Sequence, residues 1–189
     1  MSLRAFQFCF FAVAVSVFPA VPLSGALSNG QRYRVNFVDV DGNVLSTADG
    51  HVTVLVVTTP VDSEKARAVG DRVPDYCLGN PSYRMITILD FTRRHTQIVR
   101  KIATLLVRHR LDEEAKRLQA RYDEKKIARD ARGDIFTVTD FDGTVSSQLS
   151  GQSPVANFRV FVFARNGELL QQWDDVPTAT ELAAVVKEP

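Results

Sequence analysis

The sequence predicts one α/β domain built on a mixed β-sheet and preceded by an apolar export segment. Residues 52–59 (VTVLVVTT) and 83–91 (YRMITILDF) form two apolar, strand-like runs with a helical segment between them. Two strands joined in this way pair in parallel through a right-handed crossover. Residues 158–173 add an antiparallel hairpin, so the sheet is expected to be mixed. At 189 residues the chain has room for one core of ordinary size.

Composition excludes several classes of protein. Apolar residues make up 45% and charged residues 24% of the chain, which is typical of a folded globular protein and not of a disordered or multi-pass membrane protein. The formal net charge is only +1. The overall charge therefore gives no reason to expect nucleic acid as a partner.

The first part of the chain differs in character from the rest. Residues 6–26 carry no charge, and the small residues at 24–26 fit a cleavage site. We predict a signal peptide over residues 1–26 and a periplasmic or secreted domain over residues 27–189. An N-terminal membrane anchor is the alternative, because the apolar stretch is near the length that spans a bilayer, although two prolines interrupt it.

Cleavage after the predicted signal peptide leaves a single cysteine. Cys9 lies inside the apolar segment, so the mature chain holds Cys77 alone. A lone cysteine cannot close an internal disulfide. We therefore expect the packing of the core to hold the fold together.

The first half of the domain predicts a hairpin and a crossover helix. Residues 32–45 contain an extended run that ends at an Asp-Gly pair, which is typical of a tight hairpin turn. Pro60 ends the following strand, and Asp62 or Ser63 can cap the next helix. Pro74 is expected to kink or close that helix.

A long helical segment is predicted over residues 92–132. Its first 36 residues, 92–127, contain neither glycine nor proline, and apolar residues recur at helical spacing. The apolar pattern slips near Leu111, which fits one helix or two. Between Arg93 and Arg132 there are thirteen Lys or Arg against six Asp or Glu, so one surface is expected to be basic.

The C-terminal part predicts the rest of the sheet. Residues 134–149 contain a strand, a turn at DFDG, and a short strand or the start of a helix. Residues 158–173 form a hairpin around an Asn-Gly pair. Thr178 or Thr180 is expected to cap a terminal amphipathic helix.

This order of elements resembles that of the thioredoxin fold, with an additional N-terminal hairpin. FVDVDGNVLSTADGHVTVLVV is similar to the opening of the redoxins, the superfamily that includes alkyl hydroperoxide reductases and thiol-specific antioxidant proteins. TDFDGTVSSQLS and FRVFVFARNGELLQQWDDVPTATELAAVV are similar to their second half. The resemblance covers most of residues 33–186. It implies an α/β three-layer sandwich with a mixed central sheet, helices on both faces, an N-terminal β-hairpin and an elongated basic helix.

The chain departs from this family where the family carries its redox site. The resemblance implies a reactive cysteine at the start of the first crossover helix, but residues 58–66 (TTPVDSEKA) contain none. Neither Asp nor Ser exchanges with a disulfide. The family also places a cis-proline before the hairpin strand, where this chain has Phe158 or Arg159. The resemblance therefore implies a degenerate site at Pro60, Val61, Asp62, Ser63, Phe158 and Arg159.

Two hypotheses follow for Cys77. It stands in the segment PDYCLGNP, beyond the expected redox site, where a helix ends or a loop begins. We expect a buried structural cysteine. The alternative is a single-cysteine thiol peroxidase or reductase of the redoxin type that uses Cys77 as its catalytic residue.

The polar residues predict neither a metal nor a cofactor. His95 and His109 are fourteen residues apart on one predicted helix, too far to share an ion, and no second cysteine or carboxylate cluster accompanies them or His51. The pattern Asp-x-Asp-Gly occurs at residues 39–42 and 140–143. Because no calcium-loop glutamate follows at the required spacing, both are interpreted as hairpin turns.

The basic part of the long helix is the candidate interaction surface. It is a solvated face, a peripheral contact with an anionic membrane surface, or a docking surface for a protein. Its residues are Arg93, Arg94, Arg100, Lys101, Arg108 and Arg110. The leading hypothesis is an exported, redox-inactive protein that binds another protein of the cell envelope. A weaker one is a small ligand bound in a pocket beside Pro60 and Phe158.

Overall fold

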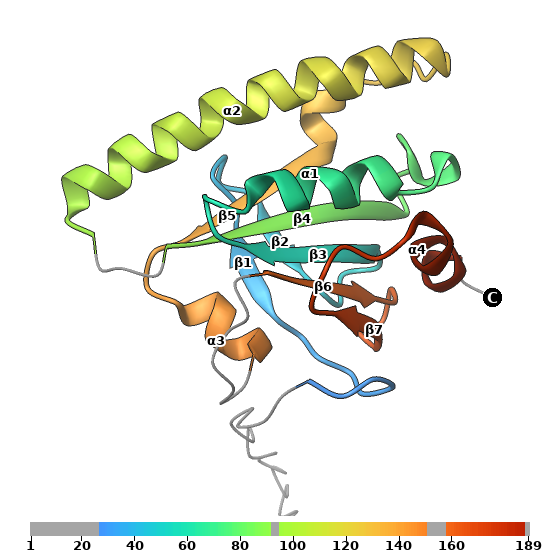
Figure 1. The fold of residues 1–189 in the computed structure, drawn as a ribbon, viewed down its shortest axis with the longest axis horizontal. Coiled ribbons are helices and arrows are strands. Elements are labelled where there is room, and N and C mark those ends of the chain that lie inside the picture. Colours follow the sequence, from blue (N-terminus) through green and yellow to red (C-terminus); the bar gives the residue numbers. More distant parts are fainter. Residues whose placement is uncertain (1–26, 92–94, 151–157, 188–189) are drawn as a thin grey trace, which may run out of the picture.

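A five-stranded mixed sheet forms the centre of the computed structural model, which describes residues 27–91, 95–150 and 158–187 (Figure 1). In spatial order the strands are β5 (Ile135–Asp140), β4 (Tyr83–Asp90), β3 (Val52–Thr58), β6 (Phe158–Phe163) and β7 (Leu169–Trp173). β3, β4 and β5 are parallel to one another, whereas β6 is antiparallel to both β3 and β7. The mixed sheet predicted from the sequence is thus confirmed.

β3 is the central strand and is buried on both faces along its whole length. Leu55 and Val57 belong to the core on one face of the sheet, while Val54 and Val56 belong to the core on the other. Side chains of a strand alternate between its two faces, so a continuous apolar run requires a covering layer on each side. The sequence run at residues 52–59 predicted this position.

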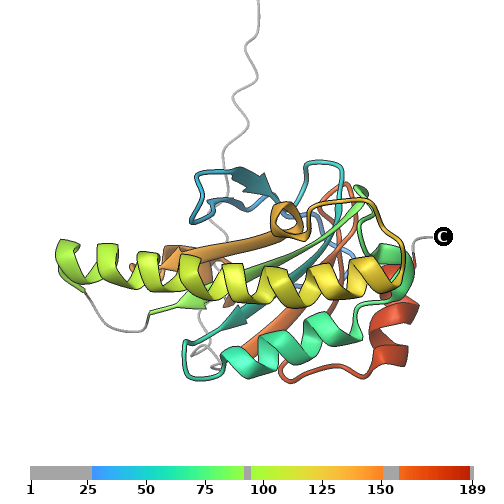
Figure 2. The same ribbon diagram turned by 90° about the horizontal axis from the view of Figure 1, so that it is seen from above.

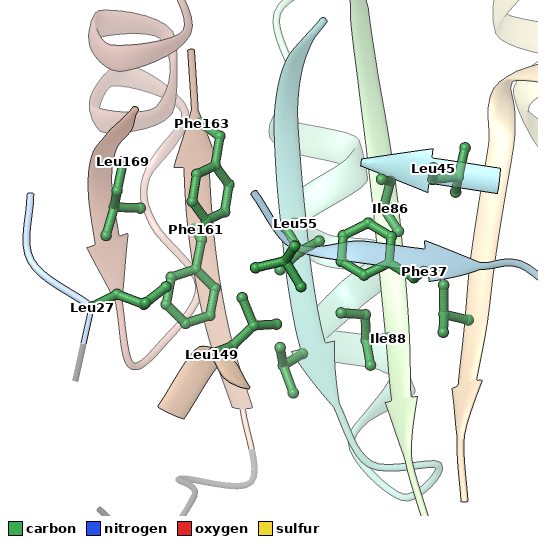
Figure 3. Packing of buried hydrophobic residues seen from close by; sticks show 13 residues of the cluster. Leu27, Phe37, Leu45, Leu55, Ile86, Ile88, Leu149, Phe161, Phe163 and Leu169 are labelled. Atoms are coloured by element: carbon green, nitrogen blue, oxygen red, sulfur yellow. The ribbon is translucent and has the colours of Figure 1, made fainter. Parts of the chain in front are cut away.

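The first covering layer consists of the N-terminal hairpin and α3 (Thr144–Ser150). The hairpin strands β1 (Asn36–Val38) and β2 (Val44–Ser46) pair antiparallel in a small sheet of their own. Figure 3 shows Phe37 and Leu45 from this hairpin beside Ile86 of β4. The core here consists of Leu27, Val35, Phe37, Leu45, Leu55, Val57, Ile86, Ile88, Val138, Leu149, Phe161, Phe163 and Leu169.

The second covering layer consists of α1 (Ser63–Arg72), the short 3₁₀ helix η1 (Asp75–Cys77) and α4 (Ala179–Val186). α1 ends before Pro74, which separates it from η1. Thr178 caps α4: its hydroxyl accepts from the Glu181 backbone N–H, and the Glu181 carboxylate accepts from the Thr178 backbone N–H. This capping box selects Thr178 over Thr180 as the start of the helix.

α2 (Gln97–Glu124) is one unbroken helix rather than two. It is followed by the 3₁₀ helix η2 (Ala131–Asp134). α2 forms the outermost layer on its side of the sheet, and its N-terminal half projects beyond the strands (Figures 1 and 2). Val107, Leu111, Ala115 and Tyr122 are its buried residues. The helix is therefore attached to the body by its middle and its C-terminal half.

The two Asp-x-Asp-Gly segments have different structures. The first is the predicted hairpin turn between β1 and β2, and the Asp39 carboxylate accepts from the backbone N–H groups of Asp41 and Asn43. The hairpin interpretation of the second was wrong, because the helix α3, and not a strand, follows β5 there. The Asp140 carboxylate accepts from the first amides of α3, at Thr144, Val145 and Ser146. Free backbone amides at a helix start explain this use of an aspartate.

The predicted signal peptide, residues 1–26, lies outside the described part of the chain. Within the described part, no helix combines the length and the apolar character needed to cross a bilayer.

Candidate functional site

The junction between β3 and α1 is the position at which the resemblance implies a redox site. Asp62 occupies the cap position of α1, but its carboxylate accepts no backbone hydrogen bond from the helix. Instead the Thr59 hydroxyl donates to Asp62 Oδ2 over 3.1 Å, and the Asp62 backbone N–H donates to the Thr59 carbonyl, also over 3.1 Å. These bonds close a tight turn. Amides in the first turn of α1 are left without a side-chain acceptor.

The side chains around the start of α1 are partly polar and partly apolar, and none of them contains sulfur. Val61 is 90% exposed and forms the tip of the turn. Ser63 opens the helix, and two residues further on the Lys65 ammonium lies 5.4 Å from the centre of the Phe158 ring. Lys65 also forms an ion pair of 3.2 Å with Asp175. The arrangement carries positive charge but holds no group that can be oxidised and reduced reversibly.

The structure brings Phe158 to this junction and directs Arg159 away from it. Thr58 and Phe158 are register partners in β3 and β6, and Phe158 is buried on the α1 face of the sheet. Arg159 is the next residue and points to the opposite face, where its Nε lies 2.9 Å from an Asp174 carboxylate oxygen. Phe158 therefore belongs to the junction, whereas Arg159 does not. Pro154, in the preceding loop, lies outside the described residues.

Cys77 lies at the opposite end of α1. The helix has 10 residues, so its two ends are about 15 Å apart. Cys77 packs in the same core as Val52, at the amino end of β3, whereas Pro60 follows the carboxyl end of that strand. Burial raises the pKa of Cys77 to about 12, so its sulfur is a thiol at neutral pH and not a nucleophilic thiolate. The helix N-terminus and the thiol are thus kept apart.

A groove of about 1130 Å³ runs between α1 and α2. It begins beside Pro60 and Val61, and Met85 and Leu89 of β4 are among its lining residues. An ion pair joins the two helices across it, with 2.6 Å between Arg67 Nη2 and Glu114 Oε1. The small-ligand hypothesis expected a pocket beside Pro60 and Phe158. The groove includes Pro60 but not Phe158.

The six basic residues predicted as an interaction surface differ in their surroundings. Arg93 and Arg94 lie outside the described part of the chain. Arg100 forms an ion pair with Asp142, and the Arg108 Nε donates to the Val40 carbonyl over 2.9 Å, so both side chains are tied to the body. Lys101 and Arg110 are exposed, and neither has an ion-pair partner among the described residues.

The exposure of the apolar residues at the start of α2 was not predicted. Ile98, Ile102 and Leu105 have the helical spacing of a core-facing stripe, yet each is more than half exposed. The buried face of α2 is set instead by Val107 and Leu111, on the other side of the helix. The slip in the apolar pattern near Leu111 was the sequence signal that the stripe changes face.

A buried pair of carboxylates also escaped the sequence analysis. Asp90 and Asp140 are register partners at the carboxyl ends of β4 and β5, and both are buried. Burial raises the pKa of Asp90; a hydrogen bond from Ser146 lowers it, and the nearby Asp140 charge adds to the rise. Each aspartate merely ends an apolar strand in the sequence. Their proximity depends on the register of the two strands.

In the described part of the chain, no three His, Cys, Asp or Glu side chains lie close enough together to hold a metal ion. The carboxylates of Asp39 and Asp140 accept hydrogen bonds from backbone amides.

Comparison with known proteins identifies the fold. No family model and no curated protein matches the chain. A thiol:disulfide interchange protein of the thioredoxin family from Chlorobium tepidum TLS is 11% identical, covers 86% of this chain and 97% of its own, and has a TM-score of 0.53. The exposed lipoprotein thioredoxin Etrx1 of Streptococcus pneumoniae TIGR4 is 14% identical, with coverages of 83% and 100% and a TM-score of 0.49. StoA of Bacillus subtilis is 13% identical, with coverages of 84% and 99% and a TM-score of 0.49. The chain has a thioredoxin-like α/β fold.

Proposed function

We propose that this chain is an exported thioredoxin-like protein that performs no thiol–disulfide exchange and acts in the cell envelope by binding another protein. The observation that carries the proposal is the separation of sulfur from the helix start. Asp62 and Ser63 stand where α1 begins, and Cys77 is buried beyond its other end.

Thiol–disulfide exchange requires a thiolate that a disulfide can reach. A helix N-terminus lowers a thiol pKa by stabilising the anion, whereas burial in apolar surroundings raises it. Cys77 has the second environment and not the first. The alternative of a single-cysteine peroxidase or reductase therefore lacks physical support.

The proposal of protein binding rests on the surface around the β3–α1 junction. Val61 projects from the tip of the turn, and the α1–α2 groove opens beside it with Met85 and Leu89 within reach. Apolar groups at a convex tip and an adjoining groove suit contact with a protein surface. Export rests on the predicted signal peptide at residues 1–26.

A redox assay tests the first half of the proposal. We expect the full chain to show no turnover of a protein disulfide with dithiothreitol, and none of peroxide with thioredoxin and its reductase. Cys77→Ala should give the same result. Turnover that is lost in Cys77→Ala would contradict the proposal and restore the single-cysteine enzyme.

A site-specific photocrosslinker tests the second half. Placed at Val61 in the expressing cell, it should join the chain to a defined envelope protein. The control is the same group at Gln148, an exposed residue of α3 on the opposite face of the sheet. Equal capture at both positions, or no adduct at Val61, would count against this surface.

A further inference from the structure

The N-terminal half of α2 carries an apolar stripe that faces solvent. Its five residues, exposed to between 43% and 72%, are Ile98, Val99, Ile102, Leu105 and Leu106. Spacings of three and four residues place them on one arc of the helix. Val107 and Leu111 attach α2 to the body from the other side. The stripe is therefore directed away from the contacts that attach α2 to the sheet, and Leu106 at its edge also lines the α1–α2 groove.

Basic residues lie along both edges of this apolar stripe, and this segment of the helix contains no acidic residue. Residues 97–111 contain four Lys or Arg and no Asp or Glu. At the helical angle of 100° per residue, Lys101 and Arg108 fall along one edge of the stripe and Arg110 along the other. Lys101 and Arg110 have no ion-pair partner in the described chain. The arrangement is an apolar band with a cationic margin on each side.

The C-terminal half of the same helix has a different surface. Glu113 pairs with Lys116 over 2.8 Å, and Glu114 pairs with Arg117 over 3.3 Å and with Arg67 of α1. Its charges are mixed and mutually neutralised, as on an ordinary solvated helix. The cationic, apolar character is thus confined to the half of α2 that projects beyond the sheet (Figures 1 and 2).

We propose that this half of α2 binds the surface of an anionic phospholipid bilayer. The apolar stripe would lie at the boundary of headgroups and acyl chains, with Lys101 and Arg110 extending to the phosphates. An anionic bilayer provides an apolar interior for the stripe and negatively charged headgroups for its basic margins. The proposal goes beyond the proposed function and does not depend on it.

Charge favours a membrane over a second copy of the chain. If two copies met along the stripe, the basic margins of both helices would face each other, and residues 97–111 supply no acidic side chain to neutralise them. Phospholipid headgroups carry the opposite charge, so the same margins attract the bilayer. The position of α2 as an outermost layer leaves its outer surface open to a flat surface (Figure 1).

A tryptophan on the stripe tests the proposal locally. The full chain with Leu105→Trp and Trp173→Phe has a single tryptophan. We expect its emission to shift to the blue, and to be quenched by brominated acyl chains, with vesicles that contain phosphatidylglycerol. Phosphatidylcholine vesicles should give little change, and salt should weaken the effect because it screens the attraction. Ile98→Trp in the same background is a second probe.

The matched control is Gln148→Trp in the same Trp173→Phe background. Gln148 is exposed on α3, on the opposite face of the sheet. Both variants share residues 1–26, so any membrane contact by that segment affects them equally. The depth of each tryptophan then separates contact by α2 from contact by the rest of the chain. Quenching of the two probes to the same extent would overturn the proposal.

A charge reversal tests the basic margins. Lys101→Glu with Arg110→Glu, introduced beside Leu105→Trp, should weaken binding to anionic vesicles by at least about tenfold. Arg32→Glu with Arg34→Glu makes the same change in net charge at two exposed residues before β1 and should have a much smaller effect. Far-ultraviolet circular dichroism confirms that each variant is folded.

Three results would overturn the proposal. The first is the absence of quenching with anionic vesicles at low salt. The second is binding that the Lys101/Arg110 reversal leaves unchanged. The third is a blue shift that grows with protein concentration in the absence of vesicles, which would assign the stripe to a second copy. The redox and crosslinking assays measure none of these quantities, so failure here and failure of the proposed function are distinguishable.

Discussion

Burial, more than neighbouring charge, shifts the pKa of two buried residues of this protein. Cys77 and Asp90 both have raised pKa values, and burial is the largest cause in each case. For Cys77 burial favours the protonated thiol over the thiolate. For Asp90 it makes the charged form costly in the native state, which links the stability of the protein to pH.

Asp90→Asn tests that linkage. A raised pKa means that the native state holds the Asp90 proton more tightly than the unfolded chain does. The resulting stabilisation is complete below the unfolded pKa and is lost as the pH rises through the folded one. The free energy of unfolding of Asp90→Asn relative to wild type should therefore rise between pH 4 and pH 7. Urea titrations at both pH values measure it.

Asp71→Asn is the control for that experiment, because Asp71 is exposed and its nearest cation, Arg121, is 3.9 Å away. It shows what replacing an exposed aspartate by asparagine does to stability under the same conditions. A stability difference for Asp90→Asn that stays constant over the same range would mean that the Asp90 carboxyl has an ordinary pKa in the folded protein.

At the scale of elements, helix ends decide which chemistry is available. The start of α1 has a tight Thr59–Asp62 turn and no side-chain cap, and its residues contain no sulfur. The positive end of the helix dipole there favours an anion. The start of α3 has its amides bonded to Asp140. The start of α4 is closed by the Thr178–Glu181 capping box. Of these three helix starts, only that of α1 lacks a side-chain cap.

Ser63→Cys is expected to regain an acidic thiol. The new sulfur would lie in the first turn of α1, where the helix dipole and the lack of a side-chain cap favour the thiolate. We expect Ellman's reagent to react with it at neutral pH while Cys77 stays unmodified. The double variant Cys9→Ala with Cys77→Ala is the background that isolates the new thiol. Titration of thiolate absorbance should give a pKa below the ordinary cysteine value. A normal or raised pKa would show that α1 does not provide the activating environment.

The buried Tyr122 links the C-terminal half of α2 to two neighbouring segments. The Gly79 backbone N–H donates to Tyr122 Oη over 3.0 Å, and the Tyr122 hydroxyl donates to an Asp134 carboxylate oxygen over 2.8 Å. These bonds tie α2 to the loop after η1 and to η2. Burial is also the main reason that the pKa of Tyr122 is raised to about 12.

Tyr122→Phe should lower the free energy of unfolding by about 1–3 kcal/mol, because it leaves the Gly79 amide and Asp134 without that partner. Urea denaturation measures the change. Tyr76→Phe is the matched control, since the Tyr76 ring is 47% exposed and its hydroxyl makes a long contact of 3.4 Å. That variant should lie within about 0.5 kcal/mol of wild type. Equal losses in both variants would refute the anchoring role of Tyr122.

At the scale of the whole molecule, elements with strong local signals were predictable and their mutual contacts were not. The β-branched run of β3 and the turn pairs of both hairpins determine their own structures locally. The exposure of Ile98 and the pairing of Asp90 with Asp140 depend on how α2 and β5 dock, which no local pattern encodes. The lack of sulfur at the start of α1 was visible in the sequence, but the burial of Cys77 required its neighbours in space.

The distribution of contacts predicts an uneven stability along α2. Opening of a helix requires the loss of its buried contacts, and these lie at Val107, Leu111, Ala115 and Tyr122. Residues 98–106 include exposed apolar side chains on one face, and none of their side chains is fully buried. We therefore expect their amides to exchange with deuterium faster than those of residues 111–122, while β3 exchanges slowest. Mass spectrometry of the native protein in the absence of lipid measures this order. Because both segments belong to one helix with the same solvent, uniform protection along α2 would mean that tertiary contacts do not set its stability.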